Sequence, residues 1–191
     1  MISSSHGFIF IHVPRTGGNS IQSTLLEYAD DDLIKKSEDL EQFGLRNDRF
    51  GVHKHCRLCD YHDLLGDRIY TDFFKFTSIR NPWDRLLSRW FRFKFGAVNS
   101  PVTKGRVFFR REVKPAWDKE QFIRFIEWHL NDKGADVWSA MPWVMLDGKV
   151  AIDGYIRYES VQADLDAICD KIGLPRRQLP HINRSRRTRP Y

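Results

Sequence analysis

Residues 8–21, "FIFIHVPRTGGNSI", combine the local patterns that decide the fold. An apolar β-type run stops at Pro14, Gly17 and Gly18 permit a tight turn, and the chain then enters a helical pattern. A strand that leads through a glycine turn into a helix N-terminus offers backbone N–H groups to an anion. The stretch lacks the GxxxxGK[ST] pattern of P-loop nucleotide-binding proteins, so it predicts an anion-binding loop of another kind.

Two later stretches repeat the step from an apolar run into a helical pattern. Residues 72–80, "DFFKFTSIR", precede the helical pattern "NPWDRLLSRWFRF". Residues 154–159, "GYIRYE", precede a helix that we expect to start after Ser160 and to stop at Gly173. A further helix is expected to begin near Asp118. Strands that alternate with helices predict an α/β fold, a three-layer sandwich whose central parallel sheet binds ligands at the carboxyl ends of its strands.

The length and composition of the chain favour one globular domain that binds anions. Its 191 residues, 41% of them hydrophobic, can bury one full core, so we expect a single domain over residues 1–191. The net charge of +6 indicates an anionic partner: nucleic acid, a nucleotide, an acidic glycan or lipid headgroups. The three cysteines, an odd number, do not suggest a disulfide framework. The apolar runs are too short to span a bilayer, and no positively charged leader precedes them. These features predict a cytoplasmic protein without stable membrane insertion.

A second candidate anion site follows the strand expected at residues 72–80. Arg80 leaves this strand and Ser88 lies two turns along the next helix, so both can face a second anionic group. Each motif also has an ordinary explanation, because the loop at Gly17 can be a plain tight turn and Arg80 a surface charge. Because the first loop is not a P-loop of the usual pattern, a phosphate-bearing donor of another kind is expected.

The residues of both loops resemble a known family. "HVPRTGGNSI" at residues 12–21 and "FKFTSIRNPWDRLLSRW" at residues 74–90 are similar to the two cofactor signatures of the sulfotransferase family that includes heparan sulfate 2-O-sulfotransferase and smaller bacterial relatives. "YIRYESVQADLDAICDKIGLP" and "LPHINRSRR" look like later segments of that family. The resemblance implies the P-loop-NTPase-like sulfotransferase fold, 3′-phosphoadenosine-5′-phosphosulfate (PAPS) as donor, adenosine 3′,5′-bisphosphate (PAP) as product, and no requirement for a metal.

The resemblance also implies roles for individual residues. The first loop would bind the 5′-phosphosulfate through Arg15, Thr16, Gly17, Gly18, Asn19 and Ser20. The 3′-phosphate would be bound by Arg80 and Ser88, and the donor phosphates would be covered by Arg184 and Ser185. The family more often has lysine at the position of Arg15. Arginine keeps the positive charge but has another geometry, so we expect donor binding to survive and the turnover rate to be the property in question. Because relatives usually continue past the final "RPY", part of a lid or acceptor wall is expected to be missing beyond Tyr191.

Residues 53–62, "HKHCRLCDYH", contain the candidate catalytic base. Transfer to a hydroxyl group needs a side chain that takes the proton of the acceptor, and histidine is used most often. The "KH" step at His55 resembles the catalytic histidine of the family and stands a similar distance ahead of Arg80, so His55 is the candidate and His53 the alternative. A zinc site built from Cys56, Cys59 and the histidines at 53, 55 and 62 is less well supported, because one CxxC lacks a second ligand pair.

Three functional hypotheses follow from these patterns. The leading one is a PAPS-dependent sulfotransferase that moves a sulfuryl group to a hydroxyl, with a glycan or glycoconjugate as acceptor and no nucleic acid as partner. The alternatives are a P-loop nucleoside or nucleotide kinase and a basic nucleic-acid-binding module. Arg157 and Glu159 point the same way from their strand and are expected to be structural, bracing the site. Four tryptophans can stack on sugars or belong to the core: Trp117, Trp128, Trp138 and Trp143.

Overall fold

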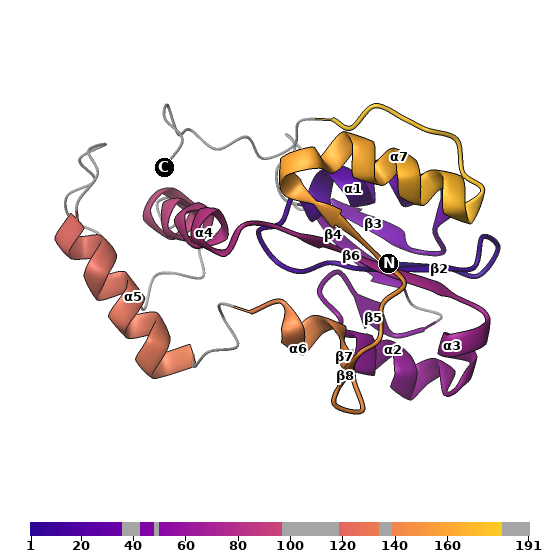
Figure 1. The fold of residues 1–191 in the computed structure, drawn as a ribbon, viewed down its shortest axis with the longest axis horizontal. Helices are drawn as coiled ribbons and strands as arrows, with labels where there is room; N and C mark the ends of the chain where they lie inside the picture. Colours follow the sequence, from indigo (N-terminus) through magenta and orange to yellow (C-terminus); the bar gives the residue numbers. More distant parts are fainter. Residues whose placement is uncertain (36–42, 48–49, 97–118, 134–138, 181–191) are drawn as a thin grey trace. The chain divides into compact units, whose positions relative to one another are not determined.

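The computed structural model describes residues 1–35, 43–47, 50–96, 119–133 and 139–180 (Figure 1). The chain forms two compact units. The first runs from Met1 to Asn81 and resumes at Ala140, and the second begins at Pro82. Each unit is described by itself, and the single domain over residues 1–191 stays a prediction.

A four-stranded sheet forms the centre of the first unit. Its order is β1-β2-β6-β9, with β1 at Ile2–Ser3, β2 at Phe8–Ile11, β6 at Phe74–Ile79 and β9 at Gly154–Arg157. The pairs β2–β6 and β6–β9 are parallel, and β1 is an antiparallel edge strand. The three expected strands therefore form the expected parallel sheet, and their carboxyl ends meet at one edge.

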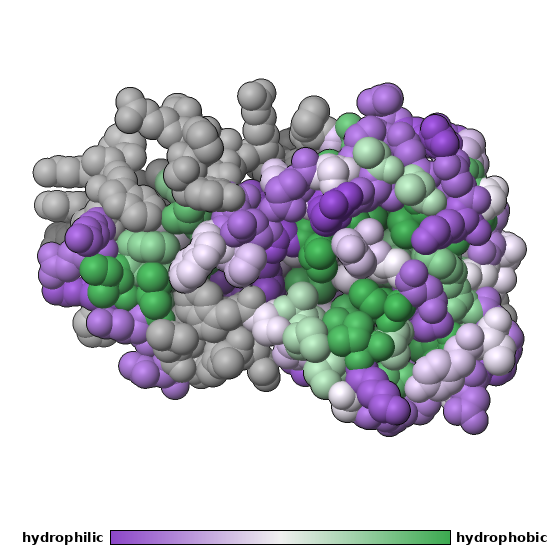
Figure 2. All heavy atoms as spheres, in the orientation of Figure 1, coloured by the Kyte–Doolittle hydropathy of each residue, from purple (hydrophilic) through white to green (hydrophobic). Residues whose placement is uncertain are grey.

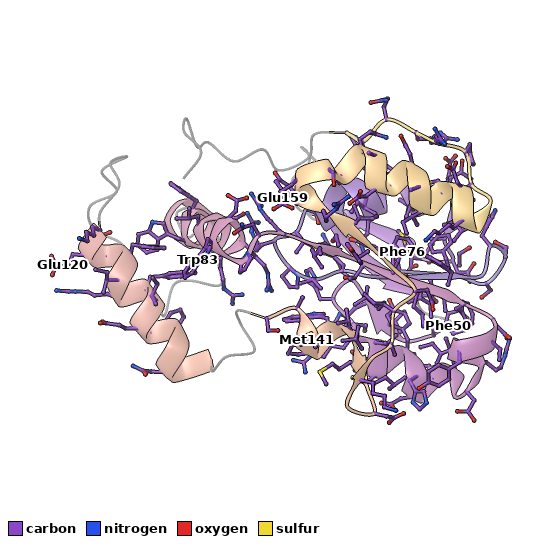
Figure 3. The ribbon with its side chains drawn as sticks, in the orientation of Figure 1. Phe50, Phe76, Trp83, Glu120, Met141 and Glu159 are labelled. Atoms are coloured by element: carbon purple, nitrogen blue, oxygen red, sulfur yellow. The ribbon has the colours of Figure 1, made fainter. Side chains whose placement is uncertain are left out.

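Alternating side chains of β2 divide the core into two layers. Phe8 and Phe10 belong to one buried cluster, and Ile9 and Ile11 belong to another. The helices α1 (Gly18–Leu25) and α7 (Val161–Ile172) pack on the first cluster, whereas α2 (Leu58–Leu65) and α3 (Arg68–Thr71) pack on the second. Figure 1 shows these two pairs of helices on opposite faces of the sheet, and Figure 3 labels Phe76 between them. The prediction of a three-layer α/β sandwich is confirmed.

The ends of the helices follow their local sequence with small differences. α7 stops at Gly173, whose φ of 71° is in the left-handed region, as the sequence predicts. Ser160 precedes α7 but makes no cap to its backbone; its hydroxyl donates to the Asp164 carboxylate at 3.0 Å. α1 is followed by a short 3-10 helix, η1, at Leu26–Tyr28. Asp118, the expected start of another helix, lies outside the described residues.

Smaller elements between the main strands were not predicted. An antiparallel sheet is formed by β3 (Asp32–Lys35), β4 (Phe43–Asn47) and β5 (Val52–His53). Before β9 come α6 (Met141–Val144) and a hairpin of β7 (Met145–Leu146) and β8 (Lys149–Val150). Figure 2 shows hydrophobic side chains gathered on the visible face in the region where Figure 1 draws α6, β7 and β8. Val150 of β8 is exposed.

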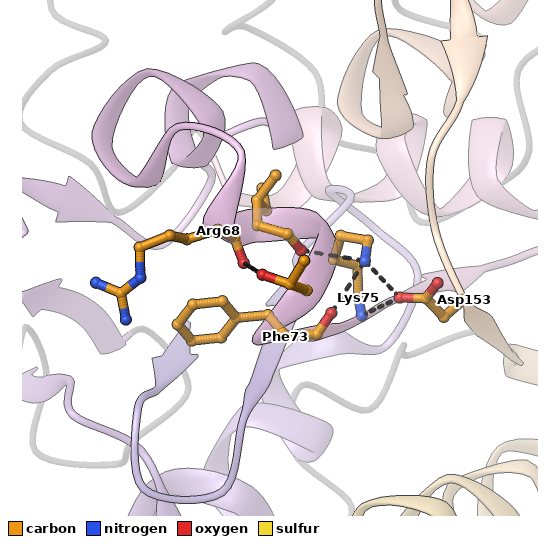
Figure 4. A network of polar contacts seen from close by, with 6 residues as sticks. Arg68, Phe73, Lys75 and Asp153 are labelled. Carbon is orange, nitrogen blue, oxygen red and sulfur yellow. Dashed lines mark hydrogen bonds and ion pairs between the residues drawn. The ribbon is translucent and has the colours of Figure 1, made fainter.

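A buried lysine joins the beginnings of β6 and β9 (Figure 4). The ammonium group of Lys75 donates to the carbonyl oxygens of Ile69 and Phe73 at 3.2 and 2.9 Å, and it lies 2.8 Å from a carboxylate oxygen of Asp153. The backbone N–H of Lys75 donates to the same carboxylate at 2.7 Å. Lys75 is 4% exposed, so its charge is compensated almost entirely by these oxygens.

The second unit contains α4 (Pro82–Gly96) and α5 (Lys119–Lys133). Trp90 packs against the rings of Phe122 and Phe125, with centroid distances of 5.8 and 5.1 Å. Trp128 is half-buried against the same cluster. Neither these helices nor any other in the described parts of the chain is long and apolar enough to cross a membrane.

Candidate active site

The loop between β2 and α1 is fastened to the neighbouring strand. The Thr16 hydroxyl donates to the carbonyl oxygen of Val13 at 2.7 Å and lies 2.6 Å from the Ser78 hydroxyl on β6. Thr16 and Ser78 are both buried. The loop backbone enters the left-handed region at Arg15, with φ of 70°, and at Gly17, with φ of 85°. The loop is thus held in one shape before any ligand binds.

Close approaches explain both glycines of the loop. A Cβ atom on Gly17 would lie 2.9 Å from Cδ2 of Tyr158, and one on Gly18 would lie 2.3 Å from Cδ2 of His12. Gly17 is also the N-cap residue of α1, and no side chain caps this helix. The first N–H groups of a helix have no partner within it, so α1 can present such groups to an anion above the loop.

Arg80 leaves the carboxyl end of β6 and reaches the same loop. One of its guanidinium nitrogens donates to the carbonyl oxygen of Arg15 at 3.3 Å. Its guanidinium carbon lies 3.8 Å from the centroid of the Tyr158 ring. The structure therefore brings Arg80 to the first loop, as the strand order of a parallel sheet leads one to expect.

The residues after β9 support this edge of the sheet. The Glu159 carboxylate accepts a hydrogen bond from the backbone N–H of Asn81 at 2.8 Å. This bond ties the 3-10 helix η5 (Tyr158–Ser160) to the end of β6, and Figure 3 labels Glu159. Arg157 instead binds both oxygens of the Asp164 carboxylate, at 2.9 and 2.8 Å. These hydrogen bonds hold the pKa of Asp164 well below its usual value. Of the two residues expected to brace the site, Glu159 makes the direct contact with the end of β6.

Ser88 lies on α4, which belongs to the second unit. Its side chain is buried, with 3% exposed. The pairing of Ser88 with Arg80 on one phosphate stays a prediction. The predicted donor contacts Arg184 and Ser185 lie outside the described residues.

His55 has a defined tautomer at the edge of the same loop. Its Nδ1 lies 3.1 Å from the carbonyl oxygen of His12, and because a carbonyl only accepts, Nδ1 carries the proton. Nε2 then holds the lone pair that a general base needs. The residue is exposed, but its ring loses hydration where it faces His12, and this loss lowers the pKa. Nearby Lys54 and His53 lower the pKa further, while the hydrogen bond to His12 offsets part of the shift. At neutral pH His55 is thus a neutral base open to solvent.

His12 is a residue of this site that the sequence analysis missed. It is 4% exposed, its Nδ1 lies 2.8 Å from Oε1 of Gln22, and its ring centroid lies 4.6 Å from that of His55. Burial, followed by the proximity of His55 and Lys54, lowers the pKa of His12 well below its usual value, so it is neutral. A polar residue at the end of an otherwise apolar strand, directly before the glycine turn, was the available signal.

The cysteines near His55 are part of the core. Cys56 is buried in the cluster under α2, and Cys59 is half-buried against it. Burial raises the pKa of the Cys56 thiol. Within the described ranges, which include residues 53–62, no group of three or more histidine, cysteine, aspartate or glutamate side chains could hold a metal ion.

The tryptophans considered for sugar stacking are only partly described. Trp143 is half-buried against the cluster under α2, and the guanidinium carbon of Arg57 lies 5.5 Å from its ring centroid. Trp128 packs within the second unit. Trp117 and Trp138 lie outside the described residues. For Trp128 and Trp143, a packing role is thus observed.

A comparison with protein-family models identifies the family of the chain. A sequence model described as the sulfotransferase family matches residues 1–190, which is nearly the whole chain. The chain belongs to the sulfotransferase family, and the activity that this membership supports is transfer of sulfuryl groups. The match is to the family as a whole and does not select a particular member such as heparan sulfate 2-O-sulfotransferase. Searches of curated proteins and of solved structures found no significant match.

Proposed function

We propose that the protein transfers the sulfuryl group of PAPS to a hydroxyl group of a carbohydrate acceptor. The observation that carries this proposal is the position of a neutral histidine beside a glycine loop. Nδ1 of His55 donates to the carbonyl oxygen of His12, the residue that opens the loop, so Nε2 carries the lone pair of the neutral ring. An acid–base group therefore lies next to the place where an anionic donor would bind.

The donor side of the site fits a nucleotide with two anionic groups. The turn at Gly17 and Gly18 is packed against the rings of Tyr158 and His12, which supports the loop that would bind the donor. Arg15 and the N-terminus of α1 would bind the 5′-phosphosulfate, as family resemblance implies, together with Thr16, Asn19 and Ser20. Arg80 and Ser88 would bind the 3′-phosphate. Positive charge from arginine suffices to compensate these groups, so the proposal needs no metal.

The proposed reaction is a direct displacement at sulfur. The acceptor oxygen attacks the sulfur atom while Nε2 of His55 takes the hydroxyl proton. The bond between sulfur and the bridging oxygen breaks, and that oxygen leaves with the 5′-phosphate as part of PAP. Arg15 would stabilise the negative charge on the leaving phosphate, an electrostatic role that arginine fills without giving up a proton.

The first experiment compares donor binding with turnover. Thermal-shift titration should show stabilisation by PAP without magnesium and little by 5′-AMP, because a ligand that binds only the folded state raises the melting temperature. Preference for ATP with magnesium would replace the proposal with a kinase. With PAPS and a panel of glycan acceptors, His55→Ala should lower kcat by about 10²–10⁴-fold, the usual contribution of a general base, and leave PAP binding unchanged.

Two variants test whether the base is His55 itself. His62→Ala, on α2, serves as the matched control and should keep full activity. His53→Ala tests the alternative base; near-normal turnover in His55→Ala together with loss in His53→Ala would transfer the role to His53. In the wild type, activity should fall only below the usual histidine pKa near 6.5, because the pKa of His55 is lowered and the neutral base persists to more acidic pH.

A further inference from the structure

Tyr158 contacts both halves of the donor site, although the proposed reaction gives it no role. Its ring lies under the guanidinium group of Arg80, 3.8 Å from ring centroid to guanidinium carbon. The edge of the same ring lies against Gly17, where a Cβ atom would be 2.9 Å from Cδ2 and 3.2 Å from Cε2. Tyr158 itself is 39% exposed, so it is a surface ring rather than a core residue.

The stacked geometry fixes the direction of the Arg80 side chain. A long arginine side chain otherwise samples many rotamers, and a planar group held against an aromatic face loses most of that freedom before a ligand arrives. The Arg80 hydrogen bond to the Arg15 carbonyl oxygen, at 3.3 Å, restricts the same group further. An aromatic face holds a guanidinium by a cation–π contact, and this contact does not neutralise the positive charge as a carboxylate would.

The position of Tyr158 is itself determined from two sides. The backbone of η5 is tied to the end of β6 through Glu159, which accepts the Asn81 N–H at 2.8 Å. On the other side, the absence of a side chain at Gly17 makes the space that the ring edge fills. The ring is thus held between the first loop and the end of the neighbouring strand.

We propose that Tyr158 is a positioning residue that sets the preference for a nucleotide with a 3′-phosphate, by holding Arg80 in its binding orientation. This inference rests on the proposed function, because it takes Arg80 as the partner of the 3′-phosphate. Tyr158 acts through Arg80 and does not take part in the chemical step. Its loss should therefore weaken PAP binding and leave the affinity for 5′-AMP, which lacks the 3′-phosphate, unchanged.

The experiment is isothermal titration of the full chain with PAP and with 5′-AMP. Tyr158→Leu keeps an apolar side chain beside Gly17 but removes the aromatic face, and we expect PAP affinity to fall about 5- to 10-fold, the range of a partly desolvated cation–π contact. Tyr158→Phe keeps the face and should retain wild-type affinity. Tyr155→Leu, at an exposed tyrosine of β9, is the matched control and should change neither titration.

A double-mutant cycle separates an effect through Arg80 from general damage. If Tyr158 acts through Arg80, then Tyr158→Leu should have no further effect on PAP affinity in the Arg80→Ala background. Equal weakening of PAP and 5′-AMP, or an unchanged preference for PAP in Tyr158→Leu, would overturn the role of Tyr158 while the sulfotransferase proposal stands. A wild-type protein that binds PAP no better than 5′-AMP would instead overturn the proposed donor, and this inference with it.

Discussion

Replacement of Gly18 by alanine tests how tightly the candidate base is coupled to the donor loop. The new Cβ atom would lie 2.3 Å from Cδ2 and 2.4 Å from Nε2 of His12, about 1 Å closer than the 3.4 Å at which ordinary contact begins. The His12 ring has little room to retreat, because it is 4% exposed, stacks on Phe10 at 6.0 Å and faces His55 at 4.6 Å. Either the ring or the start of α1 has to shift.

The expected cost combines two opposing effects. Overpacking of a tight site costs about 1–3 kcal/mol, whereas alanine in a helix is favoured over glycine by about 0.5–1 kcal/mol. Gly18→Ala should therefore lower the free energy of unfolding by about 1–2 kcal/mol. Because the His12 carbonyl orients His55, a displacement of about 1 Å should also lower turnover by roughly 10²-fold.

The assay is urea unfolding followed by circular dichroism, with a second variant that removes the obstacle. In a His12→Ala background the alanine at position 18 has space, so Gly18→Ala should there raise the free energy of unfolding by about 0.5–1 kcal/mol. Ser23→Ala, at an exposed position of the same helix, controls for helix propensity and should change stability by less than about 0.5 kcal/mol. The reasoning is refuted if Gly18→Ala has the same effect in both backgrounds.

Three further predictions concern the support of the site. Thr16→Val should cost about 1–3 kcal/mol in urea unfolding, since it leaves the Ser78 hydroxyl and a buried carbonyl without their bond, and Thr16→Ser should retain stability. Lys75→Met should cost about 2–4 kcal/mol, because a half-exposed carboxylate and two carbonyl oxygens lose their donor; an unchanged urea midpoint would contradict this. The hydrogen bonds from Arg157 lower the pKa of Asp164 in the folded protein. This pair therefore stabilises the fold at pH values above the pKa of an aspartate in the unfolded chain, near 3.9, and the stabilisation is lost progressively as the pH falls below that value. Asp164→Asn should lower the melting temperature at pH 7 and flatten its decline below about pH 4.

The parallel sheet and the donor loop could be predicted because their signals are local. Apolar runs at residues 8–13, 72–80 and 154–159 each contain a strand of the central sheet, and the glycines after the first run form the turn they suggest. The antiparallel sheet of β3, β4 and β5 was not predicted, because its strands are short and show no long apolar run. Short strands of this kind depend on pairing with a neighbour rather than on their own pattern.

The residues missed at the site depend on contacts between distant parts of the chain. His12 acts on a histidine 43 positions later, and no local pattern indicates that pairing. Tyr158 gains its role from the order of the strands, which brings η5 beside both Gly17 and Arg80. His55 itself was identified through the family resemblance, since a lone histidine in a loop carries no distinguishing signal.

The ion pair between the buried Lys75 and the half-exposed Asp153 has a consequence at the opposite end of the sheet. Two backbone bonds accompany it, from Lys75 N–H to the Asp153 carboxylate at 2.7 Å and from Asp153 N–H to the Lys75 carbonyl at 2.6 Å. Together they anchor the alignment in which Ile79 pairs with Arg157, so that Arg80 comes opposite Tyr158 one step further on. A deletion of one residue within β9 would place a different side chain under Arg80. Anyone who transplants the donor loop to another parallel sheet would thus need to carry this distant alignment anchor along with the loop.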